Sequence, residues 1–209
     1  GPDHGRLPGP PHGALILYEA ASFAILWAKE AVFMRLFLGI ELPLFWREAL
    51  DPGAAGLRRA GVRANFTRTD NYHLTLVFLG ETHRAEAAAA ALHQVEASPF
   101  PLRSASPGCF SKKGRDIWWL GVEPLPGLMA VQRQLEGALR DAGFSPEGRP
   151  YRPHITLARK VRSPGGLEPL TLPGLFPALE ARVTRLTLFS SERVEGVLRY
   201  LPVDRKSIM

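Results

Sequence analysis

His73-Leu74-Thr75-Leu76 and His154-Ile155-Thr156-Leu157 are two copies of one short pattern, and they determine the fold that we predict for the chain. Each copy lies in an apolar run rich in β-formers, 72–79 and 154–158, so each run predicts a buried strand. Side chains alternate between the two faces of a strand. Each copy therefore presents an imidazole beside a hydroxyl on one face and apolar side chains on the other.

Two such strands suggest two similar halves that face each other across a cleft. A single His-x-Thr is more often structural than catalytic, but here it recurs with the same apolar flanks. One imidazole can act as general base and the other as general acid, because a pKa near 6.5 leaves both protonation states accessible at neutral pH. The Thr hydroxyls can donate hydrogen bonds to an oxyanion between them. Phosphate ester chemistry fits these groups.

Composition describes a globular protein of 209 residues, 45% hydrophobic and 22% charged. The single Cys109 excludes an internal disulfide. The formal net charge of +6 favours polyanionic partners such as RNA. No Gly-x-Gly-x-x-Gly, Walker loop, His-Glu-x-x-His or Cys pair is present. We therefore expect no metal and no cofactor.

Residues 1–33 do not share the pattern of the rest. The first part is rich in Pro and Gly, and the apolar stretch that follows is interrupted by Glu19, Lys29 and Glu30, too often for a membrane span. We expect residues 1–33 to be a leader, either vector-derived or another non-native extension, and residues 34–209 to form a single bilobal domain.

Local patterns predict the remaining elements. Strands are expected at 34–42, 100–110, 116–122, 180–190 and 196–203, helices at 82–97 and 125–142, and a long irregular loop at 161–178. The segment 44–60 is helix-prone, but Asp51-Pro52-Gly53 should break or kink it. The tail up to Met209 should be frayed.

The turn at 111–115 is the densest basic cluster in the chain and is either a solvated turn or a contact to the RNA backbone. In the strand that follows it, Trp118 and Trp119 should point to opposite faces. One of them is then expected in the core and the other at the cleft.

Three blocks carry a resemblance to a known family: Met34-Arg35-Leu36-Phe37-Leu38-Gly39-Ile40-Glu41-Leu42-Pro43, Asn71-Tyr72-His73-Leu74-Thr75-Leu76-Val77-Phe78-Leu79-Gly80, and Arg152-Pro153-His154-Ile155-Thr156-Leu157-Ala158-Arg159. The chain resembles the 2H phosphoesterases, and among them the bacterial and archaeal RNA 2′,3′-cyclic phosphodiesterases, also called 2′-5′ RNA ligases. The resemblance implies an α+β fold with two antiparallel-rich sheets, related by pseudo-twofold symmetry around a central cleft, with helices outside.

The same resemblance implies an enzyme that hydrolyses a terminal RNA 2′,3′-cyclic phosphate to a 2′-phosphomonoester without metal. It implies His154 as proton acceptor and His73 as proton donor, with Thr75 and Thr156 binding the non-bridging phosphate oxygens. By microscopic reversibility, the same groups can join the cyclic phosphate to a 5′-hydroxyl as a 2′-5′ linkage.

Two arginines flank the second motif. Arg152 is spaced to share a face with His154, whereas Arg159 would face away in a regular strand and would need a bend or bulge beyond Ala158 to reach the cleft. An Arg at this flank recurs in the family as a phosphate contact. We expect both arginines to contribute to phosphate binding.

Two other functions remain open. The fold can serve as a non-catalytic module that binds RNA ends or nucleotides, or as a 2H phosphodiesterase for another cyclic phosphate or for 2′,5′-linked oligonucleotides. We expect a cytoplasmic monomer with no membrane partner. For the RNA phosphodiesterase that the resemblance implies, the partner is RNA with a 2′,3′-cyclic phosphate end.

Overall fold

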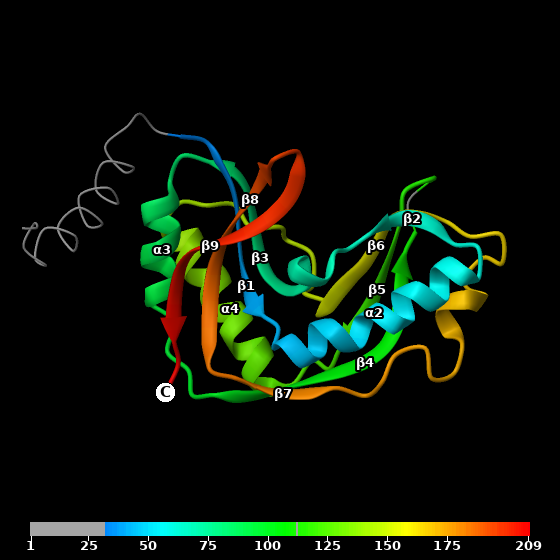
Figure 1. The fold of residues 1–209 in the computed structure, drawn as a ribbon. Helices are drawn as coiled ribbons and strands as arrows, with labels where there is room; N and C mark the ends of the chain where they lie inside the picture. Colours follow the sequence, from blue (N-terminus) through cyan, green and yellow to red (C-terminus); the bar gives the residue numbers. More distant parts are fainter. Residues whose placement is uncertain (1–31, 112) are drawn as a thin grey trace, which may run out of the picture. The chain divides into compact units, whose positions relative to one another are not determined.

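Two antiparallel sheets organise the part of the chain that the computed structural model describes, residues 32–111 and 113–209 (Figure 1). The first sheet has the order β3 (His73–Thr82), β1 (Met34–Glu41), β8 (Arg185–Val194), β9 (Val197–Ser207). The second has the order β2 (Arg63–Phe66), β6 (His154–Arg162), β5 (Asp116–Val122), β4 (Phe100–Phe110), β7 (Glu180–Val183). The predicted α+β fold with two antiparallel sheets is confirmed, and each sheet holds one motif strand, β3 or β6. The predicted leader lies almost wholly outside the described residues.

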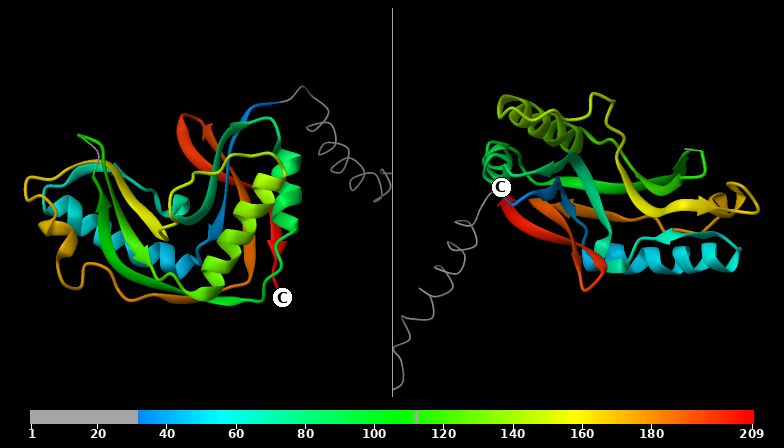
Figure 2. Two further views of the ribbon diagram at one scale, coloured as in Figure 1. Left: turned by 180° about the vertical axis from the view of Figure 1, so that it is seen from behind. Right: turned by 90° about the horizontal axis from the view of Figure 1, so that it is seen from above.

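Three α-helices accompany the sheets in the described part of the chain (Figure 2). Helix α3 (Ala85–His93) contacts β1, β8 and β9, and α4 (Pro126–Asp141) lies beside α3 and contacts β3 and β4. Helix α2 (Leu44–Arg59) runs along the five-stranded sheet (Figure 1). Within residues 32–111 and 113–209, no helix is both long and apolar enough to cross a membrane.

The motif strands turn their apolar side chains into the core, as the alternation predicts. Leu74 and Ile155 are fully buried, and so are Leu36 and Leu38 of β1. Burial of this kind is worth roughly 1.5–3 kcal/mol for each side chain. It fixes the register of both strands, because a slip of one residue would move the motif His and Thr to the core face.

The predicted break at Asp51-Pro52-Gly53 is wrong, because α2 continues through Pro52. The helix is held by a buried stripe that includes Trp46, Leu50 and Leu57. Gly53 lies against the loop at 175–176, where a Cβ would come within 2.7 Å of the Leu175 carbonyl oxygen. Packing along the whole helix therefore outweighs the local cost of the proline.

The single strand predicted at 180–190 is two strands in different sheets. Residues 180–183 pair with β4, and the chain then crosses at Thr184. From Arg185 it pairs with β9, and residues 187–190 also pair with β1. The predicted frayed tail is also wrong, because β9 reaches Ser207 and Ile208 is only 4% exposed.

Candidate active site

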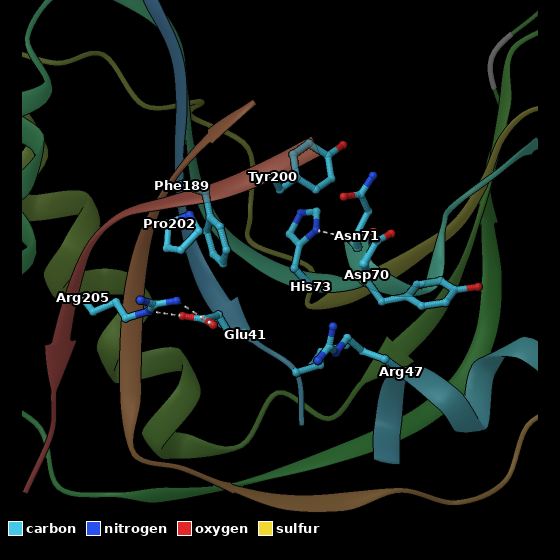
Figure 3. Close-up of a pocket in the computed structure, with 11 residues that line it drawn as sticks. Glu41, Arg47, Asp70, Asn71, His73, Phe189, Tyr200, Pro202 and Arg205 are labelled. Carbon is cyan, nitrogen blue, oxygen red and sulfur yellow. Dashed lines mark hydrogen bonds and ion pairs between the residues drawn. The ribbon is translucent and has the colours of Figure 1, made fainter. Parts of the chain in front are cut away.

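The backbone just before β3 fixes the orientation of His73. Its Nδ1 lies 2.7 Å from the carbonyl oxygen of Asn71 (Figure 3). Because a carbonyl can only accept, Nδ1 carries the proton and donates it. Nε2 then accepts a hydrogen bond from the Thr75 hydroxyl at 3.0 Å. The imidazole therefore presents a proton-accepting nitrogen beside the Thr hydroxyl.

His154 is held in the same way. Its Nδ1 lies 2.7 Å from the carbonyl oxygen of Arg152, two residues earlier, so Nδ1 is again the protonated nitrogen. Nε2 of His154 remains available for proton transfer. The two motifs thus share one backbone hydrogen bond and one tautomer.

A β-bulge brings Arg159 to the motif face of β6. Thr156 pairs with Trp119 and Ala158 pairs with Trp118, so Leu157 is the inserted residue. After the bulge the alternation is shifted by one, and Arg159 faces the same side as His154. Burial and, after it, the positive charge of Arg159 lower the pKa of both His73 and His154.

Strand β3 carries the equivalent bulge. Thr75 pairs with Gly39 and Val77 pairs with Leu38, so Leu76 is inserted. Val77 is then equivalent to Ala158, and Phe78 occupies the position that Arg159 has in β6. The two halves match in backbone, but only the second carries a cation at this place.

Aromatic rings surround both imidazoles, and sequence reasoning missed most of them. The ring centroid of His73 lies 4.7 Å from that of Tyr200 and 4.8 Å from that of Phe37. The ring of His154 lies 4.9 Å from Phe110 and 6.0 Å from Trp119. The alternation of β1 and β5 could have indicated Phe37 and Trp119, but nothing in the sequence shows that Tyr200 and Phe110 lie beside the motif histidines.

The tryptophan pair and Arg152 lie as the alternation predicts. Trp118 is buried in the core, and Trp119 lies beside His154. The guanidinium of Arg152 lies 4.7 Å from the centroid of the Trp119 ring, within cation–π distance. Arg152 is therefore held next to the second motif. Of the basic turn, Lys112 lies outside the described residues.

Burial sets the protonation of both imidazoles. Desolvation, followed by the charges of Arg159 and His154, lowers the pKa of His73 to about 4, although the hydrogen bond to Asn71 opposes the shift. Burial also lowers the pKa of His154, together with Arg159 and Arg152. Both side chains are therefore neutral at pH 7 without ligand. The negative charge of a bound phosphate would raise both pKa values.

Hydrogen bonds also tie the motif strands to their surroundings. The hydroxyl of Tyr151, just before β6, donates to the backbone carbonyl of Thr75 in β3 at 2.8 Å. Burial raises the pKa of Tyr151, so the hydroxyl stays protonated. On the other side, the Thr67 hydroxyl donates to the carbonyl of Thr156 at 2.8 Å. The Tyr151 hydrogen bond therefore ties the segment just before the second motif to the first motif.

A pocket of about 110 Å³ opens beside His73. It is lined by Glu41, Leu42, Arg47, Asp70, Asn71, Tyr72, His73, Phe189, Tyr200, Pro202 and Arg205 (Figure 3). In the described part of the chain, no three His, Cys, Asp or Glu side chains gather closely enough to hold a metal ion.

Comparison with known proteins places this arrangement in a family. The family model of the 2′-5′ RNA ligase superfamily matches residues 47–195. The chain belongs to this superfamily. Among curated members, it is 32% identical over 163 residues to the RNA 2′,3′-cyclic phosphodiesterase of Thermotoga maritima, covering 76% of this chain and 87% of that one. It is 31% identical over 181 residues to that of Escherichia coli K12, covering 82% and 94%.

Solved structures of the superfamily agree with the fold. The structure of E. coli LigT complexed with 3′-AMP aligns with a TM-score of 0.69 at 27% identity, covering 85% of this chain and 99% of LigT. LigT complexed with ATP aligns with a TM-score of 0.65.

Proposed function

We propose that this member of the superfamily hydrolyses a 2′,3′-cyclic phosphate at the end of an RNA and leaves a 2′-phosphomonoester. The observation that carries the proposal is the pair of imidazoles, one on each motif strand, each anchored through Nδ1 to a backbone carbonyl. The curated relatives named RNA 2′,3′-cyclic phosphodiesterase support the same reaction.

The two motifs supply all the groups that the reaction needs. Nε2 of His154 removes a proton from water, whose oxygen attacks phosphorus. The bond from phosphorus to O3′ breaks, and His73 gives a proton to O3′. A 3′-hydroxyl and a 2′-phosphomonoester result.

Three side chains complement the negative charge on the phosphate oxygens. The hydroxyls of Thr75 and Thr156 donate to the non-bridging oxygens, and the guanidinium of Arg159 offsets the developing charge. Arg152, held on Trp119, adds a second cation at the His154 side. These contacts gain strength in the transition state, when the oxygens carry more charge.

His73 must be protonated to act as the acid, and its lowered pKa opposes this in the free enzyme. In the proposed mechanism, the bound phosphate provides the opposing charge and raises that pKa. The same two imidazoles serve the reverse reaction, in which a 5′-hydroxyl replaces water and a 2′-5′ linkage forms.

The test is hydrolysis of a short RNA ending in a 2′,3′-cyclic phosphate, in excess EDTA. We expect metal-independent turnover that falls by a factor of about 10² to 10⁴ in His73→Ala and in His154→Ala, the usual contribution of a general acid or base. His93→Ala is the matched control, because His93 lies on α3 and pairs with Asp204 at 2.9 Å, away from both motifs.

The product must be the 2′-phosphomonoester, as mapped by phosphatase sensitivity and chromatography against 2′- and 3′-phosphate standards. Near wild-type rates in both motif variants would overturn the assignment of the site. If wild type binds the RNA end without turnover, the chain is a binding module. If it cleaves only another cyclic phosphate or 2′,5′-linked oligonucleotides, the chain is a phosphodiesterase but the proposed RNA substrate is wrong.

A further inference from the structure

A row of polar and charged groups leads away from His73 across the four-stranded sheet. Glu41 of β1 pairs directly with His73 of β3, so the two side chains share a face. Oε1 of Glu41 accepts hydrogen bonds from Thr187 of β8 at 2.8 Å and from Arg205 of β9 at 2.7 Å. The row therefore extends from the proposed acid to the far edge of the sheet.

A second pocket, of about 290 Å³, adjoins the one beside His73. The two pockets share Glu41, Leu42 and Arg47 in their linings. The second is completed by Ile40, Pro43, Leu102, Ala181, Arg182, Val183, Thr184 and Arg185. It thus lies where the chain crosses from β7 to β8, beyond Glu41 as seen from His73.

Positive charge dominates this second pocket. Arg47, Arg182 and Arg185 line it, and Glu41 is its one carboxylate. Burial alone would raise the pKa of Glu41, but hydrogen bonds from Arg205 and Thr187 outweigh it and the pKa is lowered, so Glu41 is ionised. Its charge is already shared with Arg205, outside the pocket, and lies 3.8 Å from Arg185. A net positive pocket results.

Arg47 is the central group. It lines both pockets, and its Nε is buried without a hydrogen-bond partner among the described residues. Figure 3 shows its side chain reaching from the start of α2 toward the space beside His73. A buried charged N–H without an acceptor is costly, whereas a guanidinium binds phosphate oxygens strongly and with two N–H groups at once.

We propose that this second pocket binds an internal phosphodiester of the RNA strand, upstream of the terminal cyclic phosphate. The proposal rests on the proposed function and extends it. It makes the enzyme selective for oligonucleotide ends over nucleoside 2′,3′-cyclic monophosphates, which lack the internal phosphate. Arg47, Arg182 and Arg185 are the residues that recognise it.

The test compares kcat/KM for a nucleoside 2′,3′-cyclic monophosphate with kcat/KM for di- and trinucleotides that end in the same cyclic phosphate. Wild type should prefer the longer substrates. In Arg182→Ala/Arg185→Ala, the ratio of trinucleotide to mononucleotide kcat/KM should fall by about tenfold, the size of a lost charge-assisted contact. Arg133→Ala, on the exposed face of α4, removes a positive charge elsewhere and should leave the ratio unchanged.

A second readout measures the phosphate contact itself. Binding of a fluorescent trinucleotide to the His154→Ala protein should weaken with salt. Adding Arg182→Ala/Arg185→Ala should reduce the slope of log K against log salt by roughly 0.7, the value for one phosphate contact on a single strand. Arg47→Lys keeps the charge but loses the two-pronged geometry, and it should lower the length preference partly.

The outcomes separate this proposal from the proposed function. If wild type cleaves mono- and trinucleotides equally well, or if the double variant leaves the ratio and the salt slope unchanged, the phosphate pocket is wrong while the phosphodiesterase activity stands. Absence of turnover on every cyclic phosphate would instead contradict the proposed function.

Discussion

Arg159 shows how one inserted residue changes the chemistry of a site. In a regular strand it would face away from His154, and only the bulge at Leu157 turns it toward the motif face. Its guanidinium lowers the pKa of both imidazoles and, as we propose, binds the phosphate. The same residue thus adds to the effect of burial on the histidines before binding and, in the proposed mechanism, offsets substrate charge afterwards.

Replacing Arg159 with Gln should therefore have two separable effects. Removal of a positive charge stabilises the protonated imidazoles, so the pKa of both His73 and His154 should rise, although burial keeps them below the ordinary value. Because His154 must be neutral to act as base, the acid limb of the kcat/KM profile should move to higher pH. The value of kcat/KM should fall roughly 10- to 100-fold with the lost phosphate contact.

NMR titration of the imidazole ring signals, together with the pH–rate profile, checks this prediction. Arg162→Gln is the matched control, since Arg162 lies on the same strand and is exposed. An unchanged pKa of both histidines in Arg159→Gln would show that the guanidinium does not act on them.

At the scale of the elements, the sequence predicted what depends on local pattern. The motif strands, β4 and β5 follow from their runs of β-forming residues and from the turn residues that bound them. The continuous α2 and the split between β7 and β8 could not be predicted. Trp46 and Leu50 stabilise α2 through tertiary packing, and nothing in the alternating sequence around Val183 marks a change of sheet at Thr184.

Tyr151 is the element-scale link whose loss we expect to matter. Its hydroxyl joins the segment before β6 to the carbonyl of Thr75, so Tyr151→Phe should lower the free energy of unfolding by about 1 kcal/mol. A positioning role predicts more than that: kcat should fall several-fold with little change in KM, because the spacing of the two motifs would loosen. Chemical denaturation and steady-state kinetics measure the two effects. A stability loss without any change in kcat would leave Tyr151 purely structural.

At the scale of the whole molecule, the site combines symmetry and asymmetry. Both motif strands have the same anchored imidazole and the same bulge, and the repeated motif had predicted that the two halves would be similar. The surroundings differ. Phe78 stands where the second half has Arg159, and its ring lies 4.9 Å from the guanidinium carbon of Arg35. On the motif face of the second half, Arg152 follows from its spacing to His154, whereas Arg159 follows from the sequence only once the bulge is known.

This asymmetry bears on which imidazole is the acid. A cyclic phosphate has a poor leaving group that needs a proton, whereas 4-nitrophenolate leaves without one. On an aryl phosphodiester that the enzyme accepts, loss of the acid should therefore cost little and loss of the base should cost as much as on RNA. With His73 as acid, His73→Ala should retain most of the aryl activity, while His154→Ala should lose a factor of about 10² or more.

The comparison is decisive because each variant is its own control across the two substrates. If His154→Ala keeps the aryl activity and His73→Ala loses it, the roles are exchanged, in agreement with the strongly lowered pKa that favours a neutral His73. If both variants lose activity equally on both substrates, the imidazoles act chiefly by binding the phosphate. The pseudo-twofold arrangement makes either direction of proton transfer geometrically possible, and the unequal charges of the two halves select one.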